Sequence, residues 1–214
     1  MVARIVSAGF VQDGRRLVEH VVHADPHPGN IAVDGGGMTH VVHWDKDDDR
    51  LLWAMYDGNE WTKFTAANSG GEFASLGIRN EAEPIVAYYD GGKLKIATRA
   101  NGAWTSETVD DGAAASEEEP DADVGKYADL LVASDGSTYI AYHDATNGDL
   151  KVARGYPGNW NVQVWASEGN VGQWPALSER NGDIYVSYHD VDAGNLMFGH
   201  WMGTALEAEV VDSG

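Results

Sequence analysis

The chain has 214 residues, of which 43% are hydrophobic, so it can bury the core of one large domain or of two small ones. Its 34 acidic residues outnumber its 14 basic ones and give a formal net charge of −20, which repels the phosphates of nucleic acids and of anionic lipid headgroups. We therefore expect neither nucleic acid nor a membrane surface among its partners. The sequence contains no cysteine, which excludes disulfides and thiolate metal sites.

Glycine is abundant, at 26 residues, and short segments rich in Val, Ile, Tyr, Trp and Thr alternate with turn residues, a pattern that predicts many short strands. In chain order, residues 1–26 hold half of a repeat, in which "RLVEHVVHAD" is the last strand. Four full copies follow, at about residues 27–70, 71–123, 124–170 and 171–214, and all of them form one domain, 1–214. Each full copy has four predicted strands, which in the third copy read "ADLLVAS", "TYIAYHD", "LKVARGY" and "WNVQVWAS".

The spacing of side chains is constant from copy to copy. The third strand of each copy carries a large apolar residue and, three positions later, a small one: Leu51 and Ala54, Leu94 and Ala97, Leu150 and Ala153, Leu196 and Gly199. These pairs recur every 43 to 56 residues, and four short antiparallel strands at this period are typical of a β-propeller blade. The sequence therefore predicts an all-β fold, a β-propeller of four full four-stranded antiparallel blades plus an N-terminal half blade, or five blade positions.

A Tyr-His-Asp triplet, or a variant of it, ends the second strand of each copy, at residues 43–45, 88–90, 142–144 and 188–190. A catalytic site needs one constellation, whereas a residue that returns in every blade meets a need that all blades share. We therefore expect the first residue of each triplet to pack between blades, and the Asp to accept hydrogen bonds from the turn that follows. Trp61, Trp104 and Trp160, which begin the fourth strands, are expected to pack in the core for the same reason.

Two groups of side chains suggest metal sites. In the turn after the first triplet, Asp45, Asp47 and Asp49 alternate as the oxygen ligands of calcium loops do, which makes them a candidate site for an adventitious Ca²⁺. Five histidines near the N-terminus could bind zinc or nickel if neighbouring strands present them together: His20, His23, His27, His40 and His43. We expect no resident cofactor.

The candidate ligand site lies just before the first strand of each copy. Phe73, Tyr127 and Trp174 occupy equivalent positions there, although the first copy has Pro28 instead. In a propeller the strands nearest the axis line a funnel, so these rings could stack on the apolar faces of sugars. Asp129 and Gln173 are the expected hydrogen-bonding neighbours. The alternative is that the three rings pack between blades.

The segments "GKYADLLVASDGSTYIAYHD" and "GQWPALSERNGDIYVSYHD" resemble the blade repeats of sialidase-like, Asp-box-related bacterial β-propellers. The Asp-box signature itself, Ser-x-Asp-x-Gly-x-Thr-Trp, does not occur in the chain. Neither the arginine trio nor the Tyr and Glu pair of the sialidases can be aligned, so the resemblance assigns no catalytic residue. It implies the propeller fold, which hosts both enzymes and carbohydrate-binding, lectin-like proteins.

These observations favour a non-catalytic recognition module that binds a glycan or a protein surface through a central funnel. One alternative is a sialidase-like glycoside hydrolase or lyase, for which Glu81, Glu83 and Glu179 are the acids outside the repeat pattern. Another is a structural repeat fragment, completed by self-association into a homo-oligomer. The native compartment stays open: the opening residues lack a secretory signal, which fits an excised domain of a secreted bacterial protein.

Overall fold

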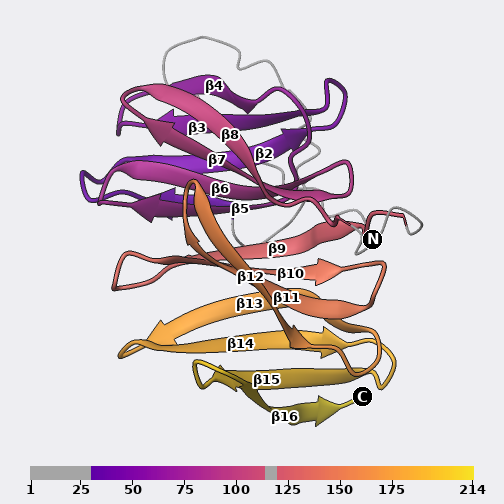
Figure 1. Ribbon diagram of the computed structural model, residues 1–214. Helices are drawn as coiled ribbons and strands as arrows, with labels where there is room; N and C mark the ends of the chain where they lie inside the picture. The colour runs from indigo at the N-terminus through magenta and orange to yellow at the C-terminus, as the bar shows by residue number, and fades with distance from the viewer. Residues whose placement is uncertain (1–29, 114–119) are drawn as a thin grey trace.

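The computed structural model describes residues 30–113 and 120–214. Within these ranges the chain forms 16 strands and no helix, arranged as four antiparallel four-stranded sheets (Figure 1). Accordingly, no helix in the described part of the chain is long and apolar enough to cross a membrane. The predicted N-terminal half blade, residues 1–26, lies outside the described residues.

Each sheet is a simple meander, in which every strand pairs with the next one along the chain. The first sheet contains β1 (Ile31–Val33), β2 (Thr39–Asp45), β3 (Arg50–Tyr56) and β4 (Trp61–Ala67). The second contains β5 (Glu72–Arg79), β6 (Glu83–Asp90), β7 (Lys93–Ala100) and β8 (Ala103–Asp110). The third contains β9 (Val124–Val132), β10 (Thr138–Asp144), β11 (Asp149–Tyr156) and β12 (Asn159–Ala166). The fourth contains β13 (Val171–Arg180), β14 (Asp183–Asp190), β15 (Asn195–Trp201) and β16 (Leu206–Ser213).

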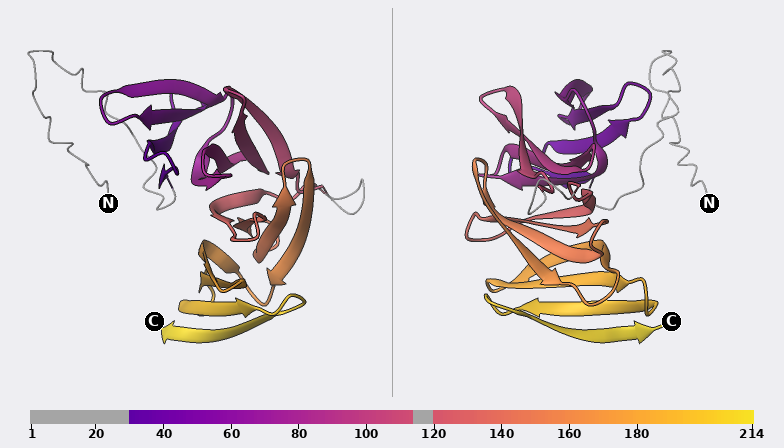
Figure 2. Two further views of the ribbon diagram at one scale, coloured as in Figure 1. Left: turned by 90° about the vertical axis from the view of Figure 1, so that its left-hand side faces the viewer. Right: turned by 45° about the vertical axis from the view of Figure 1, so that its right-hand side comes forward.

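The four sheets are the blades of a β-propeller, which confirms the predicted fold class. They follow one another around an arc that is not closed into a ring (Figure 2). The first strands of successive blades, β5, β9 and β13, contact one another and are therefore innermost, while β8 and β12 lie on the outer rim (Figures 1 and 2). Apolar side chains from facing blades form three core clusters, one at each blade-to-blade boundary.

The repeated triplets are structural, as their periodicity indicates. Tyr88, Tyr142 and Tyr188, which open three of them, are at most 3% exposed. The carboxylate of Asp144 accepts hydrogen bonds from the backbone N–H groups of the following turn, at 3.1 and 3.0 Å, and Asp190 does the same at 3.0 Å. The triplets thus hold each blade to its neighbour and close the turn between its second and third strands.

A buried polar contact joins the second blade to the third. The Tyr142 hydroxyl donates a hydrogen bond to Asp110 at 2.6 Å, and the Lys151 ammonium lies 2.5 Å from the same carboxylate. Burial alone would raise the pKa of Asp110, but the hydrogen bonds from Lys151 and Tyr142 outweigh it and hold that pKa below its usual value. Asp110 therefore stays ionised between the two blades.

The expectation for the tryptophans is right for two of the three. Trp104 is partly buried and packs on the core between the first and second blades, and Trp160 does so between the second and third. Trp61 is instead 50% exposed and contacts Tyr56, with ring centroids 5.2 Å apart. The reason is geometric: each of these tryptophans faces the preceding blade, and no preceding blade covers Trp61 in the part of the chain that the structure describes.

The backbones of neighbouring blades approach each other closely at three glycines, one at the beginning of each of the inner strands β5, β9 and β13. Gly71, Gly125 and Gly172 have positive φ angles of 128°, 98° and 85°. Each lies against the third-strand leucine of the preceding blade: Leu51, Leu94 and Leu150, all 0% exposed. A Cβ on Gly125 would lie 2.8 Å from the Cα of Leu94, and one on Gly172 would lie 2.6 Å from the Cα of Leu150.

The leucine at the equivalent position of the fourth blade shows which side chain the glycine contact buries. Leu196 is 45% exposed, because within the described residues the fourth blade has no successor. The contact requires glycine, because the residue must lack a side chain and adopt a left-handed backbone conformation. It covers a leucine side chain that would otherwise be open to solvent.

Hydrogen bonds between inner strands reinforce the stacking. The Ser75 hydroxyl of β5 accepts a hydrogen bond from the Leu130 N–H of β9 at 2.9 Å. One step further around the arc, the Asp129 carboxylate of β9 accepts one from the Leu177 N–H of β13 at 2.7 Å. Ser75 also donates to Asp129 at 3.3 Å. Burial raises the pKa of Asp129, and its hydrogen bonds offset only part of this effect.

Replacing Gly172 by Ala should destabilise the fold more than the same change at Gly182. Both have similar φ angles, 85° and 89°, so each should lose about 1–2 kcal/mol from a left-handed alanine. Only at Gly172 does the new Cβ collide with another blade, whereas nothing lies within 4 Å of it at Gly182. Chemical denaturation should therefore show an additional loss of about 1–3 kcal/mol for Gly172→Ala. Equal losses would contradict the close contact with Leu150.

The stability difference between the wild type and Asp129→Asn should depend on pH. Because the pKa of Asp129 is raised in the folded state, folding favours its protonated form. This contribution is fully present below the unfolded-state pKa of Asp, about 3.9, and is lost as the pH rises through the folded-state pKa. Asn does not titrate, so the stability of the wild type relative to the variant should fall with rising pH. Urea denaturation across the pH range in which both proteins fold measures this; a difference that stays constant or rises would contradict it.

Candidate functional site

The three candidate aromatic residues share an unusual backbone conformation. Phe73, Tyr127 and Trp174 have φ angles of 51°, 58° and 52°, in the left-handed region that bulky residues rarely adopt. Each lies two residues after a glycine that contacts the preceding blade, and β-bulges interrupt the pairing of all three inner strands in this region. A bulge re-aims the side chain it carries, at the cost of local strain.

The three bulges bring the rings together although they come from three different blades. The ring centroids of Phe73 and Tyr127 are 4.7 Å apart, those of Tyr127 and Trp174 are 4.2 Å apart, and those of Phe73 and Trp174 are 6.4 Å apart. We call these three residues the axial aromatic cluster. The rings pack on one another, yet Trp174 remains 52% exposed, and Phe73 and Tyr127 are partly exposed. Blade-to-blade packing and an open aromatic surface thus coexist.

The triplets supply the second layer around the cluster. Tyr89 lies 6.1 Å from Phe73, and His143 lies 6.1 Å from Tyr127, centroid to centroid. The His143 ring is 3% exposed and its Nδ1 is 2.9 Å from the Val171 carbonyl oxygen. Burial lowers the pKa of His143, so the ring is neutral at pH 7 and supports Tyr127 without adding charge.

One ion pair borders the cluster. Lys126, next to Tyr127 in sequence, lies 2.5 Å from Asp123, and its ammonium is 5.7 Å from the centre of the Tyr89 ring. The hydrogen bond to Asp123 raises the pKa of Lys126. The surface around the rings therefore carries fixed charges of both signs.

The two expected hydrogen-bonding neighbours differ in their surroundings. Gln173 directly precedes Trp174, is partly exposed and pairs with His189 in the sheet. Asp129 lies between the inner strands, where its carboxylate accepts hydrogen bonds from the Ser75 hydroxyl and from the Leu177 N–H group. The structure thus gives Asp129 a structural task between inner strands and leaves Gln173 beside the cluster.

The candidate metal residues do not converge. Asp45 forms an ion pair with Arg50 at 3.2 Å, and Asp49 accepts a hydrogen bond from the Trp44 indole at 3.0 Å. Across residues 30–113 and 120–214, no group of three His, Asp or Glu side chains is placed to hold a metal ion. His40 contacts Asp34 and Trp53, while the positions of His20, His23, His27 and Pro28 lie outside the described residues.

The acids considered for a catalytic site lie in or beside the turn between the first and second strands of their blades. Glu179 accepts hydrogen bonds from the backbone and the hydroxyl of Ser134 in the preceding blade, which lower its pKa. The backbone carbonyl of Glu81 accepts one from Gly35 N–H at 2.7 Å, and Glu83 accepts one from Asn80 at 2.9 Å. Glu179 belongs to the fourth blade and the other two to the second.

The sequence places the three rings at equivalent positions, but their side-chain pattern does not indicate what brings them together. The missing signal is the glycine two residues earlier, at 71, 125 and 172, since a Gly-x-aromatic pattern at the beginning of an inner strand combines a close contact with a bulge. A groove between the third and fourth blades, lined in part by Arg154, Trp165 and Trp201, was also missed.

No protein-family model matches the chain, and no curated protein sequence matches it. Among solved structures, it is similar to the Hadza microbial sialidase Hz136, with a TM-score of 0.62 and 10% identity over 86% of this chain and 46% of that one. It is also similar to 1,3Gal43A, an exo-β-1,3-galactanase from Clostridium thermocellum, with a TM-score of 0.57 and 15% identity over 89% of this chain and 48% of that one.

A third similar structure is the fucose-specific lectin from Aleuria aurantia, with a TM-score of 0.54 and 16% identity over 83% of this chain and 57% of that one. The chain thus spans about half the length of these three proteins. At such low identities the likeness establishes the fold: the chain has the β-propeller architecture that sialidases, a galactanase and a fucose lectin share.

Proposed function

We propose that the chain is a glycan-recognition module that stacks sugar rings on the axial aromatic cluster. The observation that carries this proposal is the convergence of three rings from three blades on strained backbone, with Trp174 half exposed. Trp174 thus offers an indole face on which a sugar ring can stack.

The chemistry of the cluster suits a sugar ligand. A pyranose ring has an apolar face of C–H groups that packs on an aromatic ring, and hydroxyl groups around its edge that need hydrogen-bond partners. Trp174 supplies the flat surface, while Gln173 and the Lys126–Asp123 pair lie next to the cluster in sequence and supply polar groups. The similar folds of a fucose lectin and two glycan-cleaving enzymes support the same ligand class.

Glycan-array screening followed by titration tests the proposal. The wild type should bind at least one glycan, and Trp174→Ala should weaken that binding by about 30-fold, or about 2 kcal/mol, as expected for loss of a central aromatic anchor. Tyr127→Ala should also weaken it, because Trp174 rests on that ring. Trp61→Ala is the matched control, since Trp61 is equally exposed but lies in the first blade.

Absence of binding to any glycan, or equal binding by the Trp174→Ala variant, would contradict the proposal. Turnover of aryl-glycosides by the wild type would instead identify an enzyme. Loss or retention of that turnover in the Trp174→Ala variant would then show whether the cluster is part of the catalytic site or a separate binding surface.

A further inference from the structure

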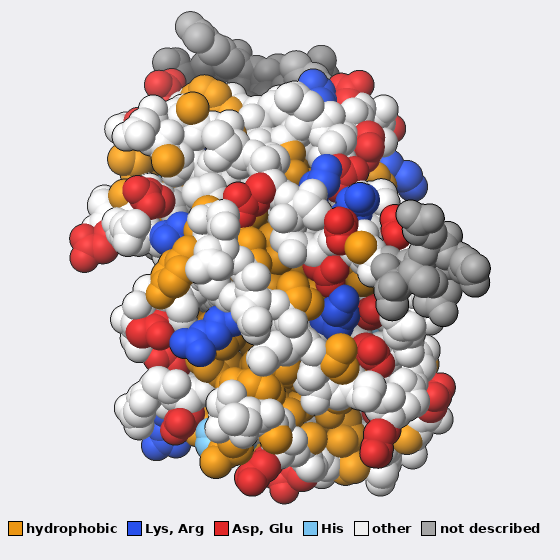
Figure 3. Space-filling view, viewed as in Figure 1, with side chains coloured by type: hydrophobic (Ala, Val, Ile, Leu, Met, Phe, Trp, Pro, Cys, Tyr) orange, Lys and Arg blue, Asp and Glu red, His pale blue; other side chains and the backbone are white. Residues whose placement is uncertain are grey.

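A groove opens on the outer part of the boundary between the third and fourth blades. Its deeper part is a pocket of about 240 Å³, lined by side chains of β10, β11 and β12 and by the end of β15. A second hollow of about 330 Å³ shares Tyr139, Arg154 and Trp201 with it and continues toward Asp183 and His200. We call the two together the blade 3–4 groove. In Figure 3, apolar side chains gather on this side of the molecule over the third and fourth blades, interrupted by basic ones.

The corresponding space is filled at the boundary between the first two blades. There Trp53, two residues after Leu51, is 0% exposed. It stacks on Phe64 with centroids 5.4 Å apart and meets Trp104 edge-on at 5.5 Å. The Arg99 guanidinium lies 4.9 Å from the centre of the Trp53 ring.

The next boundary is also filled by an indole. Trp160, which begins the fourth strand of the third blade as Trp104 does in the second, packs between the second and third blades. Its Nε1 donates a hydrogen bond to Glu107 at 2.7 Å.

At the third boundary neither of these two positions carries an aromatic ring, whereas at the second boundary only the position of Trp53 lacks one, because it holds Ile96. The position of Trp53 is taken by Val152, two residues after Leu150, and the position of Trp104 and Trp160 is taken by Leu206. Leu206 packs against the core cluster of this boundary and over Gly199, and Val152 forms part of the pocket lining. The groove therefore lies at the boundary where neither position carries an aromatic ring of the protein itself.

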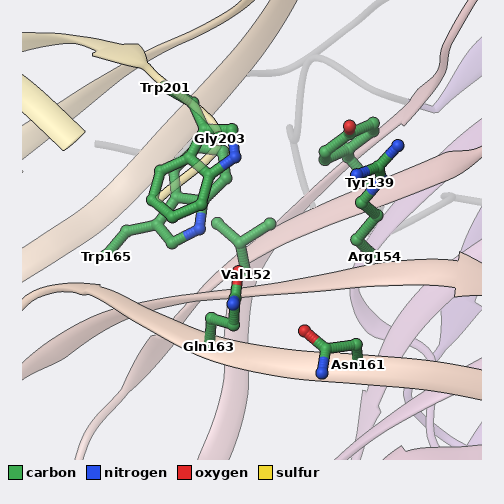
Figure 4. A pocket seen from close by; sticks show the side chains of 8 residues that line it. All are labelled: Tyr139, Val152, Arg154, Asn161, Gln163, Trp165, Trp201 and Gly203. Atoms are coloured by element: carbon green, nitrogen blue, oxygen red, sulfur yellow. The ribbon is translucent and has the colours of Figure 1, made fainter. Parts of the chain in front are cut away.

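Flat side chains form two walls of the pocket. Trp165 and Trp201 stack with centroids 4.4 Å apart and an interplanar angle of 5°. Opposite them, the Arg154 guanidinium lies 5.2 Å from the centre of the Tyr139 ring (Figure 4). Arg154 is not fully neutralised by contact, since its nearest carboxylate, Asp135, is 3.6 Å away and exposed.

Polar groups border the space between these walls. Figure 4 shows the amides of Asn161 and Gln163 beside the cavity, on the same strand as Trp165. Trp165 is 8% exposed, and its Nε1–H is buried without a hydrogen-bond partner in the structure. A ligand made only of apolar atoms would leave these donors and acceptors unpaired at a cost, whereas a ring with hydroxyl groups can pair with them.

We infer that the blade 3–4 groove binds one pyranose ring of a glycan, as a second site separate from the axial aromatic cluster. The Trp201 indole stacks on the apolar face of the sugar, and the Asn161 and Gln163 amides and the Arg154 guanidinium hydrogen-bond its hydroxyl groups. The inference does not depend on the proposed axial site, because none of its residues belongs to that cluster.

The experiment uses methyl pyranosides of glucose, galactose, mannose and fucose, with binding measured by saturation-transfer NMR and calorimetry. To isolate the groove, the titrations are made on the Trp174→Ala background as well as on the wild type. At least one pyranoside should bind on both. Gln163→Ala and Trp201→Ala should each weaken that binding by about tenfold or more, and Trp61→Ala should leave it unchanged.

Variants at Asn161, Gln163 and Leu206 keep the result independent of folding defects. Gln163 and Asn161 are exposed, so their replacement by Ala should leave the unfolding midpoint unchanged. Leu206→Trp restores the ring found at the other two boundaries and should abolish binding by filling the groove while all the residues that line it remain.

The inference is overturned if no pyranoside binds on the Trp174→Ala background, or if Leu206→Trp and Gln163→Ala both bind as the wild type does. Binding of phenol or indole in place of every pyranoside would also overturn it, because the groove would then be a dock for an aromatic side chain. Loss of binding in Trp174→Ala alone, with no effect of the groove variants, would support the axial site and refute this one.

Discussion

The architecture depends on the close contact between a glycine at the beginning of each inner strand and a leucine of the preceding blade. Gly125 and Gly172 bring backbone to within van der Waals distance of Leu94 and Leu150, where any side chain would collide. The same positive φ angles begin the bulges that carry the aromatic residues. Stacking of the blades and convergence of the rings therefore have one cause, and a change that separates the blades should also disperse the cluster.

The repeat separates structure from function. Residues that recur from blade to blade, such as the buried tyrosines of three blades and turn-closing Asp144 and Asp190, keep neighbouring blades and turns in place. Departures from the repeat leave space instead: Val152 stands where the first boundary has Trp53, Leu206 stands where the first two have Trp104 and Trp160, and a groove opens there. In a fold built from similar repeats, a ligand site is expected at a boundary whose packing residues differ from those of the other boundaries.

Much of the fold could be predicted from the sequence, because the strands and their turns are specified locally. The constant spacing of Leu51, Leu94 and Leu150 gave the blade repeat, and the equivalence of Phe73, Tyr127 and Trp174 indicated that the three rings share one environment. Their mutual contact required the bulged backbone, which no side-chain pattern specifies.

Other features depend on which blade a side chain faces. Trp61 follows the pattern of Trp104 and Trp160, yet it is exposed because a neighbouring blade, and not its own strand, buries such a residue. From the sequence, Asp129 is expected to be a polar group that lines the funnel. In the structure its carboxylate accepts a hydrogen bond from a backbone N–H of the next blade. The groove was hidden for the same reason, since its walls combine Arg154 and Trp165 of one blade with Trp201 of another.

A crystal structure of the wild-type chain is the most direct test of the link between the glycine contacts and the aromatic cluster. It should show Gly172 packed on Leu150, a positive φ at Trp174, and the Trp174 ring in contact with Tyr127. A regular inner strand with negative φ at Trp174, and rings that point away from one another into separate blades, would contradict it.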